Sequence, residues 1–392
     1  MFRKIQLAFV LIFISTHLSA KTPTLSNESK VVLFTCGMGD QLYSGFGHSA
    51  LWISDPAQGI DRLYNYGTFD FFTENFYVKF TRGKLEYMLS VTKSQRFLNE
   101  YVEEKRSAVG QNLNLTLAEK QKMFDFLENN YLPENRFYKY DFFNDNCSTR
   151  IRDVLSSTVD GDIRLNMNDK NTTFRKMLFP YLKHTPWTKF GINMILGLPA
   201  DKKARTWDYM FLPEHMHDAF ENATIEKNGE VRKLVQSETQ YLNCHIDFKN
   251  NIWDDPIVVF SLILLIVALI SFIEFKTKKY FKWLDLLLFI IALTAGLFLL
   301  FMSVGTDHSA TKYNMNILWL LPAQATFLIA LFFKNNCQMK MMRIAFFYQL
   351  TVSFAMFIWP QDAEISFMLI SMVYALRLLL FYRRAKIEPK NH

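Results

Sequence analysis

Cysteine is scarce in this chain, with four residues among 392, and this scarcity excludes a small fold stapled by disulfides. Cys36, Cys147 and Cys244 fall in a stretch that we expect to be exported, and Cys337 falls in a predicted cytoplasmic loop. The sequence allows one disulfide, between Cys36 and Cys244, which would leave Cys147 as a lone thiol. The cysteines and histidines are too scattered for a zinc-binding spacing, so we expect neither metal nor cofactor.

A charge bias of the kind that binds nucleic acid is also lacking. The formal net charge is +7, but acidic and basic residues nearly balance over residues 21–255. The excess of positive charge is concentrated in the C-terminal third, where it has a topological meaning. No internal repeat and no low-complexity linker occurs, so repeat architectures and long flexible tethers are not predicted either.

Long hydrophobic runs, by contrast, are present at both ends. Met1–Ala20 carries Arg3 and Lys4, then an apolar run over Leu7–Ile14, then small residues. This three-part pattern is typical of a cleaved secretory signal peptide, and the alternative is an uncleaved anchor helix. Because the apolar run is short for a membrane span, we expect cleavage near Ala20 and export of the chain from Lys21 onward.

The C-terminal third predicts about five transmembrane helices. Their expected bounds are Pro256–Ile273, Leu284–Met302, Asn316–Phe333, Ile344–Trp359 and Ile365–Tyr382. Lysine and arginine alternate between the connecting loops, being rich in the first and third loops and in the C-terminal tail. Since basic loops prefer the cytoplasm, this alternation places the C-terminus inside and the N-terminal domain outside.

Two apolar segments allow more than one interpretation. The third candidate span contains Asn316, Pro322 and Gln324, so it could instead be an amphipathic surface segment, which would leave four spans. As a span, its polar residues would face the bundle interior or a lipid-filled cleft. Trp187–Leu198 is too short to span and reads as a core helix or as a segment in the membrane interface.

The exported region, taken as residues 21–250, has a mixed α and β pattern. A helix is predicted over Leu117–Tyr131 from its amphipathic spacing, and Asn228-Gly229 predicts a β-hairpin between Ala223–Lys227 and Glu230–Val235. Short aliphatic and aromatic runs bounded by Gly, Pro and Asp predict strands at Val31–Cys36, His48–Ile53, Arg62–Tyr66 and Leu85–Val91.

Cys147 is the most informative candidate residue. Asn144, Asp145 and Asn146 are all good helix N-caps, and apolar residues recur at helical spacing after them. Cys147 is therefore expected in the first turn of a helix, where free amides and the helix dipole favour a thiolate. A small cysteine packed under the helix start is the alternative interpretation.

A thiolate nucleophile needs a base, and His48 is the best placed histidine. It follows a glycine-rich turn at the start of a predicted strand, from which it could project toward a helix start. A surface or core histidine without catalytic role is the alternative. Asn65, on the next predicted strand, could orient the imidazole as asparagine does in Cys-His-Asn sites, and Asp70 is the other candidate.

Several segments of this sequence together resemble the Lnb family, over nearly the whole mature chain. They are Gly47-His48-Ser49-Ala50, Tyr64–Asp70, Asn146-Cys147-Ser148-Thr149, Pro186-Trp187, Gly191, Leu196-Gly197, Asp201, Phe211-Leu212-Pro213, Asp307-His308 and Asn314–Pro322. The order of His before a helix-start Cys is also similar to circularly permuted papain-like enzymes such as lecithin:retinol acyltransferase. The resemblance implies an α+β fold, in which a permuted papain-like periplasmic domain precedes an all-α bundle of about five transmembrane helices.

The resemblance also implies a function. Lnb proteins are understood as lipoprotein N-acyltransferases of the bacterial inner membrane, with the catalytic domain in the periplasm. His48 would activate Cys147, which would take an acyl chain from a phospholipid as a thioester and pass it to the lipidated N-terminal cysteine of a diacylated lipoprotein. We expect Tyr66, Asp307 and His308 to contact these substrates, the last two at the mouth of a lipid-access cleft. His308 as a plain solvated loop residue is the alternative.

Two other functions stay open from the sequence. A periplasmic cell-wall peptidase or amidase could use the same Cys-His pair, although it would need a polar groove and would have little use for five spans. A membrane scaffold without catalysis would make Cys147 a packing residue. The expected division is a signal peptide at residues 1–20, a catalytic domain at 21–250 and a transmembrane domain at 251–392.

Overall fold

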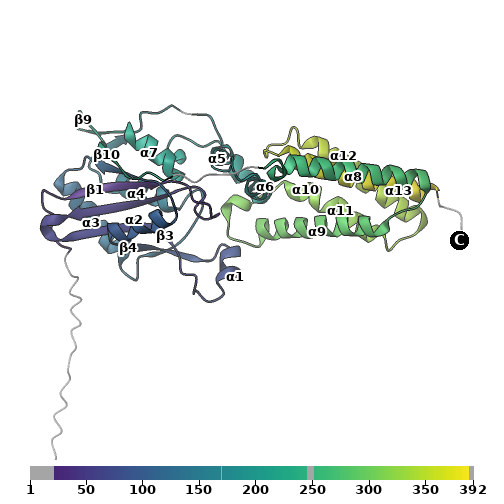
Figure 1. The fold of residues 1–392 in the computed structure, drawn as a ribbon, viewed down its shortest axis with the longest axis horizontal. Coiled ribbons are helices and arrows are strands. Elements are labelled where there is room, and N and C mark those ends of the chain that lie inside the picture. Colours follow the sequence, from purple (N-terminus) through teal and green to yellow (C-terminus); the bar gives the residue numbers. More distant parts are fainter. Residues whose placement is uncertain (1–21, 169, 245–250, 388–392) are drawn as a thin grey trace, which may run out of the picture.

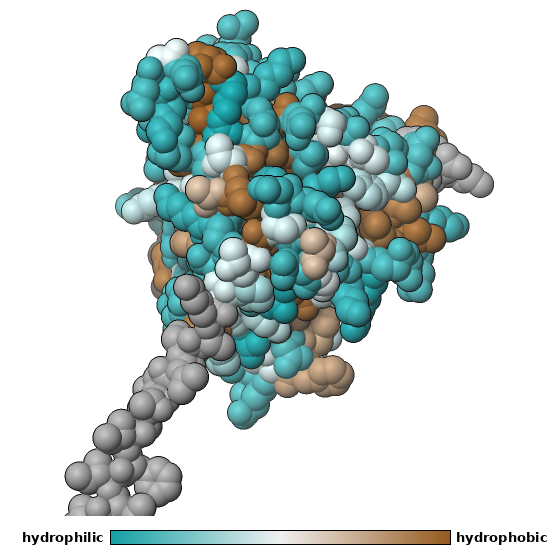
Figure 2. All heavy atoms as spheres, turned by 90° about the vertical axis from the view of Figure 1, so that its left-hand side faces the viewer, coloured by the Kyte–Doolittle hydropathy of each residue, from teal (hydrophilic) through white to brown (hydrophobic). Residues whose placement is uncertain are grey.

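The computed structural model of the chain has an N-terminal domain rich in strands and a C-terminal helical bundle, joined end to end (Figure 1). The structure describes residues 22–168, 170–244 and 251–387. The predicted signal peptide lies outside these residues. The end of the N-terminal domain that points away from the bundle is covered mostly by hydrophilic residues, with small hydrophobic patches (Figure 2).

A seven-stranded antiparallel sheet organises the N-terminal domain. In spatial order its strands are β10 (Val235–Leu242), β5 (Ala108–Leu113), β1 (Lys30–Cys36), β2 (His48–Asp55), β3 (Ile60–Thr68), β4 (Glu86–Thr92) and β6 (Phe137–Lys139). All the strands predicted between residues 31 and 91 are present, and their ends differ from the predicted ends by two residues at most. Cys36 pairs with His48 across β1 and β2, so the start of β2 lies beside the end of β1.

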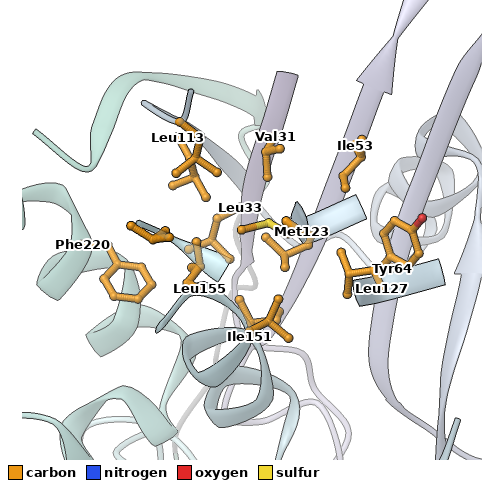
Figure 3. Close-up of a cluster of buried hydrophobic side chains, with 14 of the residues drawn as sticks. Val31, Leu33, Ile53, Tyr64, Leu113, Met123, Leu127, Ile151, Leu155 and Phe220 are labelled. Atoms are coloured by element: carbon orange, nitrogen blue, oxygen red, sulfur yellow. The ribbon is translucent and has the colours of Figure 1, made fainter. Parts of the chain in front are cut away.

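Helices cover both faces of this sheet. The main core lies under α3 (Leu117–Tyr131), α4 (Cys147–Thr158) and α7 (Pro213–Glu221), where Leu33, Ile53 and Tyr64 from the strands meet Leu127 and Ile151 from the helices (Figure 3). On the other face, Phe97 and Tyr101 of α2 (Ser94–Glu103) pack over β1 and β2. Because alternate residues of a strand share a face, Ser49 of β2 points toward α4, as Ile53 does, and His48 lies at the very start of the strand.

A small second sheet contains the predicted hairpin. Its strands are β7 (Asp162–Arg164), β8 (Thr224–Lys227) and β9 (Glu230–Lys233). Asn228 and Gly229 have φ of 51° and 85°, the positive values that a tight hairpin turn requires. The hairpin prediction is confirmed, although Val235 begins β10 instead of ending this hairpin.

Two short helices join the domain to the bundle. Arg175 of α5 (Phe174–Leu178) is fully buried and binds Asp201 at 2.8 Å. The segment at Trp187–Leu198 forms α6 (Pro186–Ile195), and its Phe190 ring packs on Phe260 and Phe367 of the bundle. This segment is therefore a packed junction helix.

Three helices of the bundle are long and apolar enough to cross a membrane, among the residues described. They are α8 (Pro256–Thr277), α9 (Lys282–Val304) and α13 (Ile365–Ile387). Large apolar side chains on α8 and α9 are exposed, including Leu265 at 66% and Ile291 at 54%. Such surfaces are stable in a bilayer and not in water.

The other two expected spans have a different form. The third candidate is broken into α10 (Asn316–Leu320) and α11 (Pro322–Ala330), because Pro322 cannot donate an amide hydrogen bond inside a helix. Its polar residues face inward: Asn316 and Gln324 are fully buried. α12 (Asn335–Ala355) begins earlier than predicted, and its first turns carry Lys340 and Arg343.

A buried ion cluster ties the three long helices together. Arg377 of α13 binds Glu274 of α8 and Asp285 of α9, each at 2.6 Å, and all three side chains are at most 9% exposed. Arg377 also donates to Ser271 at 2.9 Å. Burying a carboxylate without a partner costs folding free energy, so the packing at this end of the bundle depends on Arg377.

Replacing Arg377 with Gln should therefore destabilise the bundle by about 3 kcal/mol, because it leaves two carboxylates without their cation. Thermal unfolding in detergent micelles measures this as a lower midpoint. Arg383→Gln, on the exposed surface of the same helix, is the matched control and should leave the midpoint almost unchanged. Equal midpoints for the two variants would contradict a stabilising role for the cluster.

Candidate active site

The helix start predicted at residues 144–147 is present, and Asn146 is its cap. The Asn146 side chain accepts hydrogen bonds from the amides of Ser148 and Thr149, each at 2.9 Å, and Thr149 closes a capping box. Its amide group donates to the carbonyls of Phe142 and Phe211, which fixes the approach to the helix. Cys147 is thus the first residue of α4, and the cap leaves the Cys147 amide itself uncapped.

His48 and Asn65 lie beside this helix start. The Nε2 atom of His48 lies 2.6 Å from Oδ1 of Asn65, and the imidazole also makes a side-chain hydrogen bond with Cys147. In this arrangement Nε2–H donates to Asn65, which leaves Nδ1 for the thiol. Residues from β2, β3 and α4 are therefore joined in the order Asn65, His48, Cys147.

Asp70, the other candidate for orienting the imidazole, lies elsewhere. Its carboxylate accepts a hydrogen bond from the amide of Phe72, at the exposed start of the turn after β3.

Two serines lock the strand to the helix. Oγ of Ser49 lies 3.0 Å from Oγ of Ser148, and both residues are fully buried. Each serine is the neighbour of a site residue, so this contact fixes the distance between His48 and Cys147. The backbone amide of Ser49 also donates to the sulfur of Cys147. Sequence reasoning missed both serines because they are 99 positions apart, and their only signal is that each adjoins a site residue.

The electrostatics favour a charged pair of thiolate and imidazolium. Burial alone would raise the pKa of Cys147, but the charge and hydrogen bond of His48, with the Ser49 amide, outweigh burial and lower it. Burial alone would lower the pKa of His48, but the charge and hydrogen bond of Cys147, with the Asn65 contact, raise it. Each residue therefore stabilises the charged form of the other.

Cys36 is a useful contrast, because it is also buried and its backbone pairs with His48 across the sheet. Burial raises the pKa of the Cys36 thiol to about 12, against the opposing charge of Arg106. Burial thus keeps Cys36 a neutral thiol, whereas the surroundings of Cys147 favour its thiolate. Cys36 and Cys244 are both free, so the disulfide left open by the sequence is absent.

Gly67 forms the wall against the reacting groups. A Cβ atom at this position would lie 3.7 Å from Cβ of Cys147, 3.9 Å from Cε1 of His48 and 4.0 Å from the Tyr140 ring. The φ of Gly67 is +89°, which residues with a side chain rarely adopt. The backbone of Gly67 therefore lies close against Cys147, His48 and Tyr140, of which Tyr140 is partly exposed.

Tyr66, Asp307 and His308 have partners other than His48 and Cys147. Tyr66 is 1% exposed, lies in the core beneath the site and bonds Asn130 at 2.5 Å through its hydroxyl. Because the Tyr66 side chain is buried, it could contact a substrate only after moving out of the core. Asp307 and His308 bind the backbone of Arg82 and Phe80, at 2.9 Å and 3.1 Å, and the next residue, Ser309, binds Asp141. That loop joins the bundle to the segments around the site.

Within the described parts of the chain, no three His, Cys, Asp or Glu side chains gather closely enough to hold a metal ion.

Comparison with known proteins gave two family matches. Residues 21–180 match the family model described as the Lnb N-terminal periplasmic domain. Residues 247–387 match the one described as the Lnb transmembrane domain. No curated protein and no solved structure matches the chain.

The charged pair predicts how alkylation of Cys147 depends on pH. Because His48 lowers the pKa of Cys147, iodoacetamide should modify this thiol with a midpoint below that of an ordinary cysteine. His48→Gln should move the midpoint upward, since burial is then opposed only by the weaker hydrogen bonds of Ser49 and Ser148. Asn65→Ala should move it upward by less. Mass spectrometry of the peptide containing Cys147 gives the rates.

His217→Gln is the matched control, because His217 of α7 binds Glu238 of β10, the edge strand at the opposite end of the sheet order from β4 and β6. It should leave the midpoint unchanged. A midpoint that does not move in His48→Gln would refute the proposed charge pair.

Proposed function

The chain belongs to the Lnb family, and from this premise we propose that it is a membrane-bound thiol acyltransferase that N-acylates lipoproteins. The acyl donor is a phospholipid, and the acceptor is the free α-amine of the lipidated N-terminal cysteine of a diacylated lipoprotein. The observation that carries this proposal is that His48 contacts both Asn65 and Cys147, the first residue of a helix.

The first half-reaction loads the enzyme. The sulfur of Cys147 attacks the ester carbonyl carbon of the phospholipid, and the uncapped amide of Cys147 is placed to donate to the developing oxyanion. As the intermediate collapses, the bond from carbon to the glycerol oxygen breaks and His48 gives its proton to that oxygen. A lysophospholipid leaves, and the acyl chain stays on Cys147 as a thioester.

The second half-reaction transfers the chain. The α-amine of the lipoprotein attacks the thioester carbonyl, the carbon–sulfur bond breaks, and neutral His48 takes a proton from the amine. An amide forms and the pair of thiolate and imidazolium is restored. Asn65 holds the imidazole ring with Nδ1 toward the sulfur throughout, which serves both directions of proton transfer.

The location of the site suits substrates that never leave a membrane. Asp141, six residues before Cys147, is bonded to Ser309 of the loop that comes after the candidate span α9. An inner membrane with this domain on its periplasmic side presents donor and acceptor in one leaflet. The order of His48 before Cys147, with Cys147 at a helix start, also resembles that of circularly permuted papain-like domains of the lecithin:retinol acyltransferase kind.

The covalent intermediate is the direct test of this proposal. Purified protein incubated with phospholipid and no amine should gain one acyl group on the peptide containing Cys147, and hydroxylamine should remove it. Adding a diacylated lipopeptide with a free α-amine should discharge the adduct as N-acyl product appears. Cys147→Ser should be almost inactive, because a hydroxyl lacks the ready anion.

Two further variants test the assigned roles, and one serves as control. His48→Ala should slow adduct formation at least about 100-fold, and Asn65→Ala should slow it less, since it acts only through the ring. Cys244→Ser removes another free thiol of the same domain and should load normally. An active enzyme that never carries acyl on Cys147 under trapping conditions would overturn the mechanism.

A further inference from the structure

Residues 69–83, here called the aromatic segment, expose an unusual amount of apolar surface. They connect β3 to β4 and include the short helix α1 (Phe76–Thr81), in which no residue is buried. Phe72 is 96% exposed and Tyr77 81%. Phe71, Val78 and Phe80 are also largely exposed. A cluster of exposed apolar side chains in a folded protein marks a surface that contacts something else.

The rings of this segment pack on one another. The centroid of Phe76 lies 5.1 Å from Phe71, 5.9 Å from Phe69 and 6.0 Å from Phe80. Phe69 and Phe71 are 4.9 Å apart. This stacking gives the segment a fixed shape without the core of the domain, and leaves Phe72 and Tyr77 to project outward.

The segment is fastened to the outer end of a candidate membrane span. α9 ends at Val304, which is 73% exposed. The loop after α9 binds α1 and Arg82, the C-cap residue of α1. The amide of Asp307 donates to the carbonyl of Arg82, and His308 bonds the carbonyl of Phe80. In Figure 1, α1 stands out from the domain on the side of the bundle.

Gly83 makes this close approach feasible. A Cβ atom there would lie 3.0 Å from the amide nitrogen of His308, and the φ of Gly83 is +67°. At Gly83 the aromatic segment and the loop therefore meet backbone to backbone. This contact holds the exposed rings beside the loop that follows the end of α9.

The charges at the end of the segment nearest the loop fit a lipid surface. Lys79, Arg82 and Lys84 lie in its second half and just after it, with Arg82 and Lys84 exposed, whereas the acidic Asp70 and Glu74 lie in its first half. Aromatic side chains beside exposed cations are the composition that favours the headgroup region of a bilayer, where rings reach the acyl chains and cations meet phosphates.

We propose that the aromatic segment inserts into the interface of the membrane that α8, α9 and α13 cross, with Phe72 and Tyr77 among the acyl chains. The partner is thus the phospholipid bilayer itself. The contact of the aromatic segment with the loop after α9 favours the bilayer over a protein partner, because α9 itself is a candidate span of that bilayer.

A run of aromatic rings connects this segment to the thiol. Phe69 lies 5.3 Å from Tyr87, and Tyr87 stacks on Tyr140 at 4.5 Å. The Tyr140 ring lies beside Gly67, which adjoins Cys147. Resting on the proposed function, the segment would guide the donor's acyl ester from the leaflet along these rings to the sulfur.

Quenching by bromine tests insertion without any reference to activity. Phe72→Trp is reconstituted in vesicles of phosphatidylethanolamine and phosphatidylglycerol, with or without bromine on the acyl chains. The emission added by the new tryptophan, relative to the unsubstituted protein, should be quenched by the brominated lipid. Phe126→Trp, on exposed α3 at the far end of the domain, should add emission that is not quenched (Figure 1).

Phe72→Asp tests the role in delivery. It should lower acylation of Cys147 from vesicle lipid about tenfold, because one large side chain no longer enters the apolar phase. Its alkylation of Cys147 by iodoacetamide should stay at the rate of the unsubstituted protein. Phe126→Asp is the matched control and should load normally.

The outcomes separate the two claims. No quenching of the new tryptophan at position 72 overturns insertion, whatever the protein catalyses. Quenching in a protein that never loads Cys147 supports insertion and overturns the proposed function. Quenching together with normal loading of Phe72→Asp supports insertion and refutes the guiding role.

Discussion

The contact between Cys147 and His48 is the interaction on which the arrangement of the N-terminal domain depends. A charged pair with little access to water is stable only if further polar groups surround it. Here the surroundings are Asn65 on the far side of the ring, the Ser49 amide at the sulfur, and the start of α4. These groups come from β2, β3 and α4, so the start of β2, the second half of β3 and the start of α4 must lie close together.

The two buried cysteines show how strongly position controls chemistry. Cys36 and Cys147 both lie near His48, and burial disfavours the thiolate of each. Only Cys147 has the helix start, the imidazole contact and a backbone amide directed at its sulfur. The surroundings of Cys147 therefore favour the thiolate and those of Cys36 the neutral thiol, although both side chains are buried, at 8% and 1% exposure.

The sequence predicted those parts of the fold that depend on local signals. The bounds of α3 and the first residue of α4 follow from amphipathic spacing and from the Asn146 cap, and the turn of the hairpin follows from Asn228-Gly229. Asn65 and Asp70 could not be separated, because the choice depends on which side chain reaches His48 across two strands. The contact of Ser49 with Ser148 joins distant segments and carries no local pattern.

The helical part departs from expectation for a similar reason. Hydropathy identified α8, α9 and α13, whose surfaces must match lipid. It could not predict that α10 and α11 separate at Pro322, nor that Asn316 would find partners in α6, bonding the carbonyls of Asn193 and Met194. Pro322 breaks the helix locally, but the polar contacts that bury Asn316 against the N-terminal domain are tertiary and have no signal in the hydropathy.

The central claim is that this protein adds an acyl chain to the N-terminus of lipoproteins, and the most direct test is mass spectrometry of those N-termini in cells. Cells that carry the protein should contain lipoproteins with an N-acylated terminal cysteine. Cells without it, or with Cys147→Ser expressed at equal abundance, should contain the same lipoproteins with a free α-amine. Unchanged N-acylation in the absence of the protein, in cells with no other N-acyltransferase, would contradict the account.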